Sequence, residues 1–126
     1  MEVEPVAMVA VRVSAAAGTL AMLVAIVRAF SVASFGEDGA VLLDLAWGQV
    51  SLLDLYLALL LGWSWIWWRE RSLPRAAIWL VATVTLGSLA LFGYVLGASL
   101  RAGSPTELVL GPRRTLDDGA LSYLPR

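Results

Sequence analysis

Long apolar runs separated by short polar stretches dominate the chain. Three runs, over residues 10–34, 48–68 and 76–100, are each long enough to cross a bilayer, because about 20 apolar residues rising 1.5 Å each cover ~30 Å of hydrocarbon. The acidic stretch Gly-Glu-Asp-Gly at residues 36–39 breaks the helical pattern after the first run, and a charged stretch ending in Pro74 separates the second run from the third. The pattern predicts an all-α membrane protein with three transmembrane helices.

The end of the chain has a different character. Residues 104–126 are polar and rich in glycine, proline and paired charges, so we expect residues 1–103 to form the transmembrane domain and residues 104–126 an extramembrane tail. Ser104-Pro105-Thr106-Glu107 has the Ser-x-x-Glu form of a capping box, with proline at the first helical position. It predicts one short helical turn through Leu110, with plain coil as the alternative.

Composition agrees with a membrane protein and removes most kinds of chemistry. Hydrophobic residues make up 60% of the chain, charged residues 15%, and the mean hydropathy is +0.79. The net charge of −1 leaves no basic patch for nucleic acid. The chain has no cysteine and no histidine, which excludes disulfides, thiolate zinc sites, the commonest haem ligands and Ser-His or Cys-His nucleophiles. We therefore expect no cofactor, no metal site and no enzymatic activity.

Two charged residues fall inside the predicted spans. A carboxylate at the centre of a span costs ~2.5–3.5 kcal/mol on insertion scales, so Asp54 is a functional candidate by default. Arg28 lies near the end of the first span and Asp54 near the start of the second, and an antiparallel hairpin would bring them to similar depth. We expect a structural ion pair, for which Asp44 competes. The alternatives are a contact of Asp54 with another subunit or a lipid headgroup, and a role in proton or solute handling.

Small residues recur at the spacing that allows close helix approach. Ala17, Ala21, Ala25 and Ala29 follow one another every four residues, and Gly93 and Gly97 repeat the pattern in the third run. These residues predict helix packing, either among the helices of this chain or against another membrane protein.

Aromatic residues mark the ends of the second run. Its far end carries the cluster Trp63, Trp65, Trp67 and Trp68, followed by Arg69 and Arg71, and its near end carries Trp47. Tryptophan and arginine at these positions are typical of a membrane interface. A stacking surface for a pigment or quinone and a protein contact are the alternatives for the tryptophans, and binding of lipid phosphate is the alternative for the arginines.

Three spans would place the N-terminus and the second loop on one side of the membrane, and the first loop and the tail on the other. The arginines then nearly balance, with Arg12, Arg69, Arg71 and Arg75 against Arg28, Arg101, Arg113 and Arg114. The compact cluster in the second loop favours a cytoplasmic N-terminus. Acidic residues precede the first run where a signal peptide would be basic, which indicates an uncleaved helix. Nine arginines without lysine are typical of a GC-rich genome, so we expect a multi-pass protein of a bacterial inner membrane.

The order of several short motifs resembles a known family. The motifs are Trp47-Gly48, Asp54-Leu55-Tyr56, Trp65-Ile66, Arg69-Glu70, Trp79, Leu86-Gly87, Tyr94 and Thr106-Glu107-Leu108-Val109-Leu110. Over residues 13–114 the chain is similar to a family of small bacterial membrane proteins, related to plant ones, that is described as a domain of unknown function. The resemblance implies about three spans and no particular activity.

These observations lead to two hypotheses about function. The first is a non-enzymatic accessory subunit that packs against other membrane protein subunits in a larger, energy-converting complex. The second is a small transporter or channel subunit in which a homo-oligomer gathers several copies of Asp54 around a pathway. Replacing Asp54 by asparagine distinguishes the two.

Overall fold

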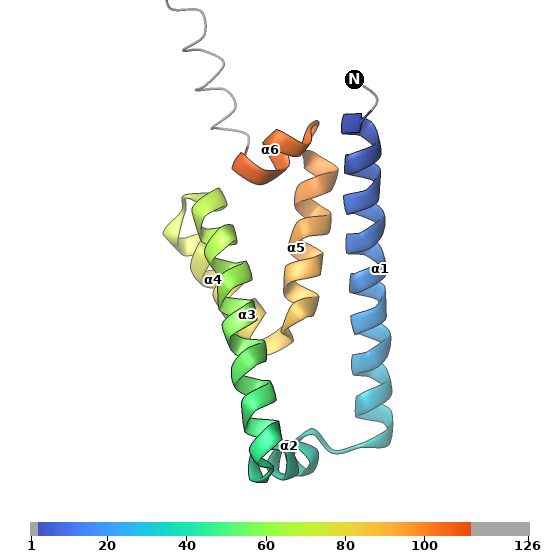
Figure 1. Cartoon of the computed structure of the whole chain (residues 1–126), viewed down its shortest axis with the longest axis vertical. Helices are drawn as coiled ribbons and strands as arrows, with labels where there is room; N and C mark the ends of the chain where they lie inside the picture. Colours follow the sequence, from blue (N-terminus) through green and yellow to red (C-terminus); the bar gives the residue numbers. More distant parts are fainter. Residues whose placement is uncertain (1–2, 112–126) are drawn as a thin grey trace, which may run out of the picture.

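The computed structural model describes residues 3–111 of the 126-residue chain. These residues form helices and no strands (Figure 1). The helices are α1 (Val3–Val32), α2 (Phe35–Asp44), α3 (Ala46–Glu70), α4 (Leu73–Leu86), α5 (Ser88–Arg101) and α6 (Pro105–Leu110).

Two helices are long and apolar enough to cross a membrane. They are α1, with 30 residues, and α3, with 25 residues, and their most apolar segments have mean hydropathies of 2.0 and 1.5. They overlap the first two predicted spans, 10–34 and 48–68, although α1 begins earlier, at Val3. The two helices run in opposite directions, and the short helix α2 joins them at the lower end of the molecule (Figure 1). Most of their apolar side chains are exposed, as expected for helices surrounded by lipid or by other helices.

The prediction of a third membrane-crossing helix over residues 76–100 is corrected by the structure. The run is divided at Gly87, whose backbone has φ +61° and ψ −136°. A residue with a side chain adopts such a conformation only under strain, whereas glycine adopts it freely. Each of the resulting helices, α4 and α5, has 14 residues. At 1.5 Å per residue each is about 21 Å long, which is less than the ~30 Å needed.

The helices α4 and α5 form a hairpin. Its two arms lie side by side, with the rings of Trp79 and Tyr94 4.9 Å apart. Arg75 at the start of α4 and Arg101 at the end of α5 line one and the same cleft. In Figure 1 the hairpin descends from the end of α3 to the middle of the molecule and then returns. It therefore begins and ends at the same end of the bundle.

This hairpin changes the grouping of the charges. The start of α1, the α3–α4 connection and the end of α5 lie together at what we call the arginine end, which carries Arg12, Arg69, Arg71, Arg75 and Arg101. The opposite end, which we call the acidic end, holds α2 with Glu37, Asp38 and Asp44. Arg101 was expected on the side opposite to Arg12, but the Arg12 side chain donates hydrogen bonds to the carbonyl oxygens of Ser99 at 3.0 Å and Ala102 at 3.3 Å. Arg113 and Arg114 lie outside the described residues.

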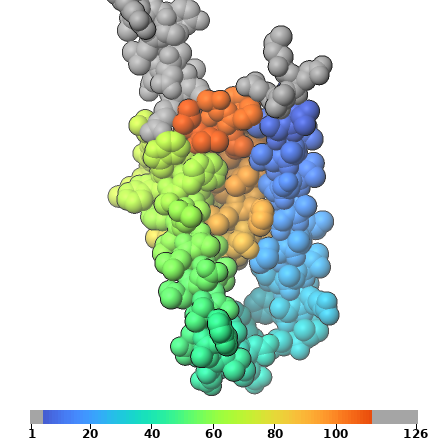
Figure 2. Space-filling view, viewed as in Figure 1, coloured from blue at the N-terminus to red at the C-terminus, as the bar shows by residue number. Residues whose placement is uncertain are grey.

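The core lies at the arginine end, where α1, α3, α5 and α6 meet. It consists of buried Met8, Ile66, Tyr94, Ala98, Ala102 and Leu108. Figure 2 shows an opening between the lower parts of α1 and α3, beyond the tip of the hairpin. Among the described residues the buried core therefore lies at the arginine end, while at the acidic end α2 packs on the start of α3.

The helix predicted from the capping box is confirmed as α6, with the serine cap as expected and the glutamate bonded one residue before the N-cap. The Glu107 backbone N–H donates to Ser104 Oγ at 3.2 Å, and the Glu107 carboxylate accepts from the backbone N–H of Gly103 at 2.8 Å. The helix extends to Leu110, and Leu108 is buried in the core. The first residues of the predicted tail are thus packed onto the bundle, whereas residues 112–126 lie outside the described part of the chain.

Candidate functional site

A hydrogen-bonded network holds the end of α3 against α5 and α6. Arg69 Nη1 donates to the Tyr94 hydroxyl at 2.9 Å, and that hydroxyl donates to Glu70 Oε1 at 2.6 Å. Arg69 Nε donates to the carbonyl oxygen of Leu108 at 2.7 Å. The Arg69 side chain is only 9% exposed. Arg69, which the sequence indicated as an interface residue, therefore connects three helices.

Aromatic side chains surround this network. The rings of Trp65 and Trp79 meet Tyr94 edge-on at centroid distances of 5.7 and 4.9 Å, a favourable arrangement for aromatic pairs. Trp63 Nε1 donates to the carbonyl oxygen of Ala76 at 2.8 Å and so connects α3 to α4. The sequence indicated Trp63 and Trp65 as membrane-interface residues, and the structure shows that they also connect helices of this chain.

The remaining tryptophans of α3 are exposed. Trp47 is 82% exposed at the lower end of the helix, and Trp67 and Trp68 are 50% and 43% exposed at its upper end. Their positions on the surface at opposite ends of one helix are those that an interfacial tryptophan requires.

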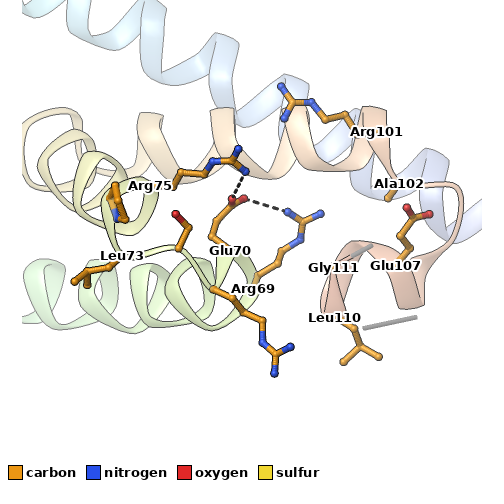
Figure 3. Close-up of a pocket in the computed structure, with 12 residues that line it drawn as sticks. Arg69, Glu70, Leu73, Arg75, Arg101, Ala102, Glu107, Leu110 and Gly111 are labelled. Atoms are coloured by element: carbon orange, nitrogen blue, oxygen red, sulfur yellow. Dashed lines mark hydrogen bonds and ion pairs between the residues drawn. The ribbon is translucent and has the colours of Figure 1, made fainter. Parts of the chain in front are cut away.

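An open cleft lies beside the network at the arginine end (Figure 3). We call it the arginine cleft. It has a volume of about 630 Å³, and its charged lining residues are Arg69, Arg71, Arg75, Arg101, Glu70 and Glu107. The Glu70 carboxylate lies between two guanidinium groups, 3.5 Å from Arg69 Nη1 and 3.6 Å from Arg75 Nη1. With four arginines and two glutamates, the cleft carries an excess of positive charge.

Two arginines of the cleft have no partner among the described residues. Arg71 follows the last turn of α3 with φ +51°, and its backbone N–H donates to the carbonyl oxygen of Trp67 at 3.2 Å. The side chains of Arg71 and Arg101 are exposed and form no ion pair or hydrogen bond with any residue from 3 to 111. Sequence reasoning missed Arg101 as a site residue because it treated residues 76–100 as one continuous helix.

A groove between α4 and α5 adjoins the arginine cleft. We call it the glycine groove. Its lining includes Trp79, Gly93, Tyr94 and Gly97, and its volume is about 470 Å³. A Cβ atom added to Gly93 or Gly97 would meet no atom of the described residues within 4 Å. The two glycines predicted to pack helices therefore lie in a groove that the described helices leave open.

Close contacts with α5 occur at two other glycines. A Cβ atom on Gly18 would lie 2.6 Å from the ring of Phe92, and a Cβ atom on Gly62 would lie 2.7 Å from Leu91. They allow α1 and α3 to approach α5, one on each side. Gly18 follows Ser14, and Gly62 follows Ala58, at the small-xxx-small spacing, so the sequence carried a local signal at both positions.

The predicted alanine face of α1 is also uncovered. Ala17, Ala21, Ala25 and Ala29 are all exposed, and a shallow depression of about 820 Å³ runs along them to Arg28 and Val32. The helix instead packs on α5 through another face that contains Ala15 and Gly18. Within the described residues, the alanine face has no helix against it.

The expected ion pair between Arg28 and Asp54 is not present in the structure. Both side chains are exposed, and the two ion pairs of the described residues both involve Glu70. The physical reason is the hairpin, because α1 packs mainly on α5 and α3 mainly on α4. The lower parts of α1 and α3, which carry Arg28 and Asp54, are therefore held apart (Figure 1).

Comparison with known proteins does not assign the chain to a family. No family model, no curated protein and no solved structure matches it. The resemblance to a family of small bacterial membrane proteins therefore stays a prediction.

Proposed function

We propose that this chain is a non-enzymatic accessory subunit of a larger membrane complex, such as an energy-converting one. In this proposal α1 and α3 cross the membrane, and the α4–α5 hairpin enters and leaves it at the arginine end. The distance between Trp47 and Trp67 supports this placement, since 20 residues of helix extend about 30 Å, close to the thickness of the hydrocarbon core.

The charges favour a cytoplasmic arginine end. Five arginines of the described residues lie at or near that end, whereas Arg28 alone among them lies toward the acidic end. Arginine and lysine accumulate on the cytoplasmic side of membrane proteins. The proposed location is a bacterial inner membrane, with α2 on the outer side.

The single observation that carries the proposal is the uncovered alanine face of α1. Helices in a membrane associate by close van der Waals packing at small residues rather than by burial of apolar surface from water. Four alanines at four-residue spacing, all exposed and lining one depression, form such a surface. We propose that its occupant is a transmembrane helix of another protein. A carboxylate or carbonyl group of that helix would contact Arg28, which lines the depression and forms no ion pair in the described part of the chain.

The test is purification of the tagged chain from its native membrane in mild detergent, followed by sizing and mass spectrometry of what accompanies it. We expect stoichiometric co-purification with one complex. The double variant Ala21→Leu/Ala25→Leu should lose it, because two leucines prevent close approach. The matched control is Ala16→Leu, which adds a leucine at an exposed position on another face of α1. A wild-type chain that purifies alone, or a control as defective as the double variant, would refute the proposal.

One observation favours the alternative of a transporter or channel subunit. Asp54 is exposed on α3 and forms no ion pair with any described residue, although an unpaired carboxylate at membrane depth is costly. In a homo-oligomer, several copies of Asp54 could line a polar pathway, and that pathway would surround each carboxylate with a polar environment. Asp54→Asn separates the two functions, since loss of a solute or proton flux with assembly intact supports transport. Loss of assembly, or no effect, supports the accessory role.

A further inference from the structure

The arginine cleft and the glycine groove form one continuous surface. Both are lined by Arg69, Glu70, Arg75 and Arg101. The surface is polar and positively charged at the arginine end, and it continues between α4 and α5 over Gly93 and Gly97. One ligand that fits both parts must have an anionic head and a slender apolar extension.

We propose that this surface binds an anionic phospholipid, with the phosphate in the arginine cleft and an acyl chain in the glycine groove. This inference requires only that the chain lies in a membrane, and it does not depend on the accessory role.

The charges of the cleft supply the recognition of the phosphate. A guanidinium group matches a phosphate with two parallel hydrogen bonds, and Arg71 and Arg101 have side-chain donors that no residue from 3 to 111 occupies. Glu70 already forms ion pairs with Arg69 and Arg75 and so fixes the positions of these two guanidinium groups. The cleft is also lined by the first residues of α4, which has no acidic residue in its first turn. The partial positive charge of that helix end adds to the attraction.

The groove distinguishes a lipid from a free phosphate ion. Its floor at Gly93 and Gly97 leaves the space of two missing side chains open, and Trp79 and Tyr94 contribute aromatic walls. A free anion would need the cleft alone. Because the groove leads from the cleft toward the middle of the proposed membrane, an acyl chain attached to a phosphate in the cleft would enter it.

The experiment is a titration of the purified chain in non-ionic detergent, with bound lipid measured by native mass spectrometry. The probes are dioleoylphosphatidylglycerol and dioleoylphosphatidylcholine, which share their acyl chains and differ in net charge. We expect the wild-type chain to prefer phosphatidylglycerol. Each arginine near a membrane surface contributes about 5-fold to binding of an anionic lipid. Arg101→Gln should therefore weaken phosphatidylglycerol binding about 5-fold, and Arg71→Gln/Arg101→Gln about 25-fold.

Two further variants make the test specific. The matched control is Arg28→Gln, which removes one exposed arginine outside the cleft and should leave binding unchanged. Gly97→Leu fills the groove without changing the charge, so it should weaken binding of phosphatidylglycerol while its circular dichroism spectrum stays that of the wild type.

The outcomes that overturn the proposal are distinct. Equal binding of the two lipids by the wild-type chain, or an equal effect of Arg28→Gln and Arg101→Gln, would show that the arginine cleft does not select the phosphate. Full displacement of lipid by millimolar inorganic phosphate, together with no effect of Gly97→Leu, would assign the cleft to a free anion. A cysteine at position 97 that crosslinks to a helix of another protein in native membranes, with lipid binding unaffected by Gly97→Leu, would assign the groove to a protein partner.

Discussion

The hairpin predicts a different membrane topology from the one that three spans would give. Gly36 and Gly103 would lie on the same side of the membrane if residues 76–100 crossed it. In the structure Gly36 is at the acidic end and Gly103 follows α5 at the arginine end. Arg12 lies at the level of Ser99 and Ala102, and 20 residues of α1 separate it from Val32, which corresponds to about 30 Å along the helix. The two positions are therefore separated by about the full thickness of the hydrocarbon core.

Single cysteines at these positions measure the topology directly, because the natural chain contains no cysteine. A side chain at position 36 meets no described atom within 4 Å, and one at position 103 meets only the Glu107 carboxylate at an ordinary 3.5 Å. Gly36→Cys and Gly103→Cys should therefore fold normally. We expect a membrane-impermeant maleimide to label position 36 in intact cells, and to label position 103 only after the membrane is permeabilised.

Each cysteine is either labelled in intact cells or protected from the reagent, so the labelling pattern distinguishes the topologies. Labelling of both positions from the same side would refute the hairpin and restore a third crossing. Opposite labelling with position 103 accessible from outside would keep the hairpin but refute the cytoplasmic placement of the arginine end. A cysteine at position 39 serves as the control for local shielding at position 36. Position 39 also lies in α2, and an added Cβ there meets no described atom within 4 Å.

Two further predictions concern the stability of the fold in detergent, measured by thermal unfolding followed by circular dichroism. Gly87→Ala should destabilise the chain by about 1–3 kcal/mol, since a side chain is strained at φ +61°. The control Gly93→Ala should have a much smaller effect, because its added Cβ meets no described atom within 4 Å. Equal effects of the two variants would contradict the role of the turn at Gly87. Tyr94→Phe should cost about 1–3 kcal/mol, because it removes a hydroxyl that joins two charged groups and leaves both less satisfied. Its control is Tyr56→Phe at a position 43% exposed, and an unchanged unfolding temperature for Tyr94→Phe would show that the network does not stabilise the bundle.

Sequence reasoning succeeded where one helix could be considered alone. The all-helical class and the two long helices α1 and α3 followed from the apolar runs. The boundaries were less accurate, because α1 begins at Val3 rather than at residue 10 and the stretch 36–39, predicted to break the helical pattern, lies within α2. The capping box also predicted α6, because its hydrogen bonds join residues within one helical turn. Such features depend on neighbours along the chain, so they are visible in the sequence.

The tertiary structure decided which helices face one another, and this placement depends on the backbone of one residue. Gly87 is one of several glycines in an apolar run, and nothing local distinguishes a glycine inside a continuous helix from one that reverses the chain. Once the chain turns there, α5 comes between α1 and the end of α3. Arg28 and Asp54 are then held apart, and Arg101 joins Arg69, Arg71 and Arg75 around one cleft. The apolar runs determined where α1 and α3 lie, whereas only long-range packing determined which side chains share a site.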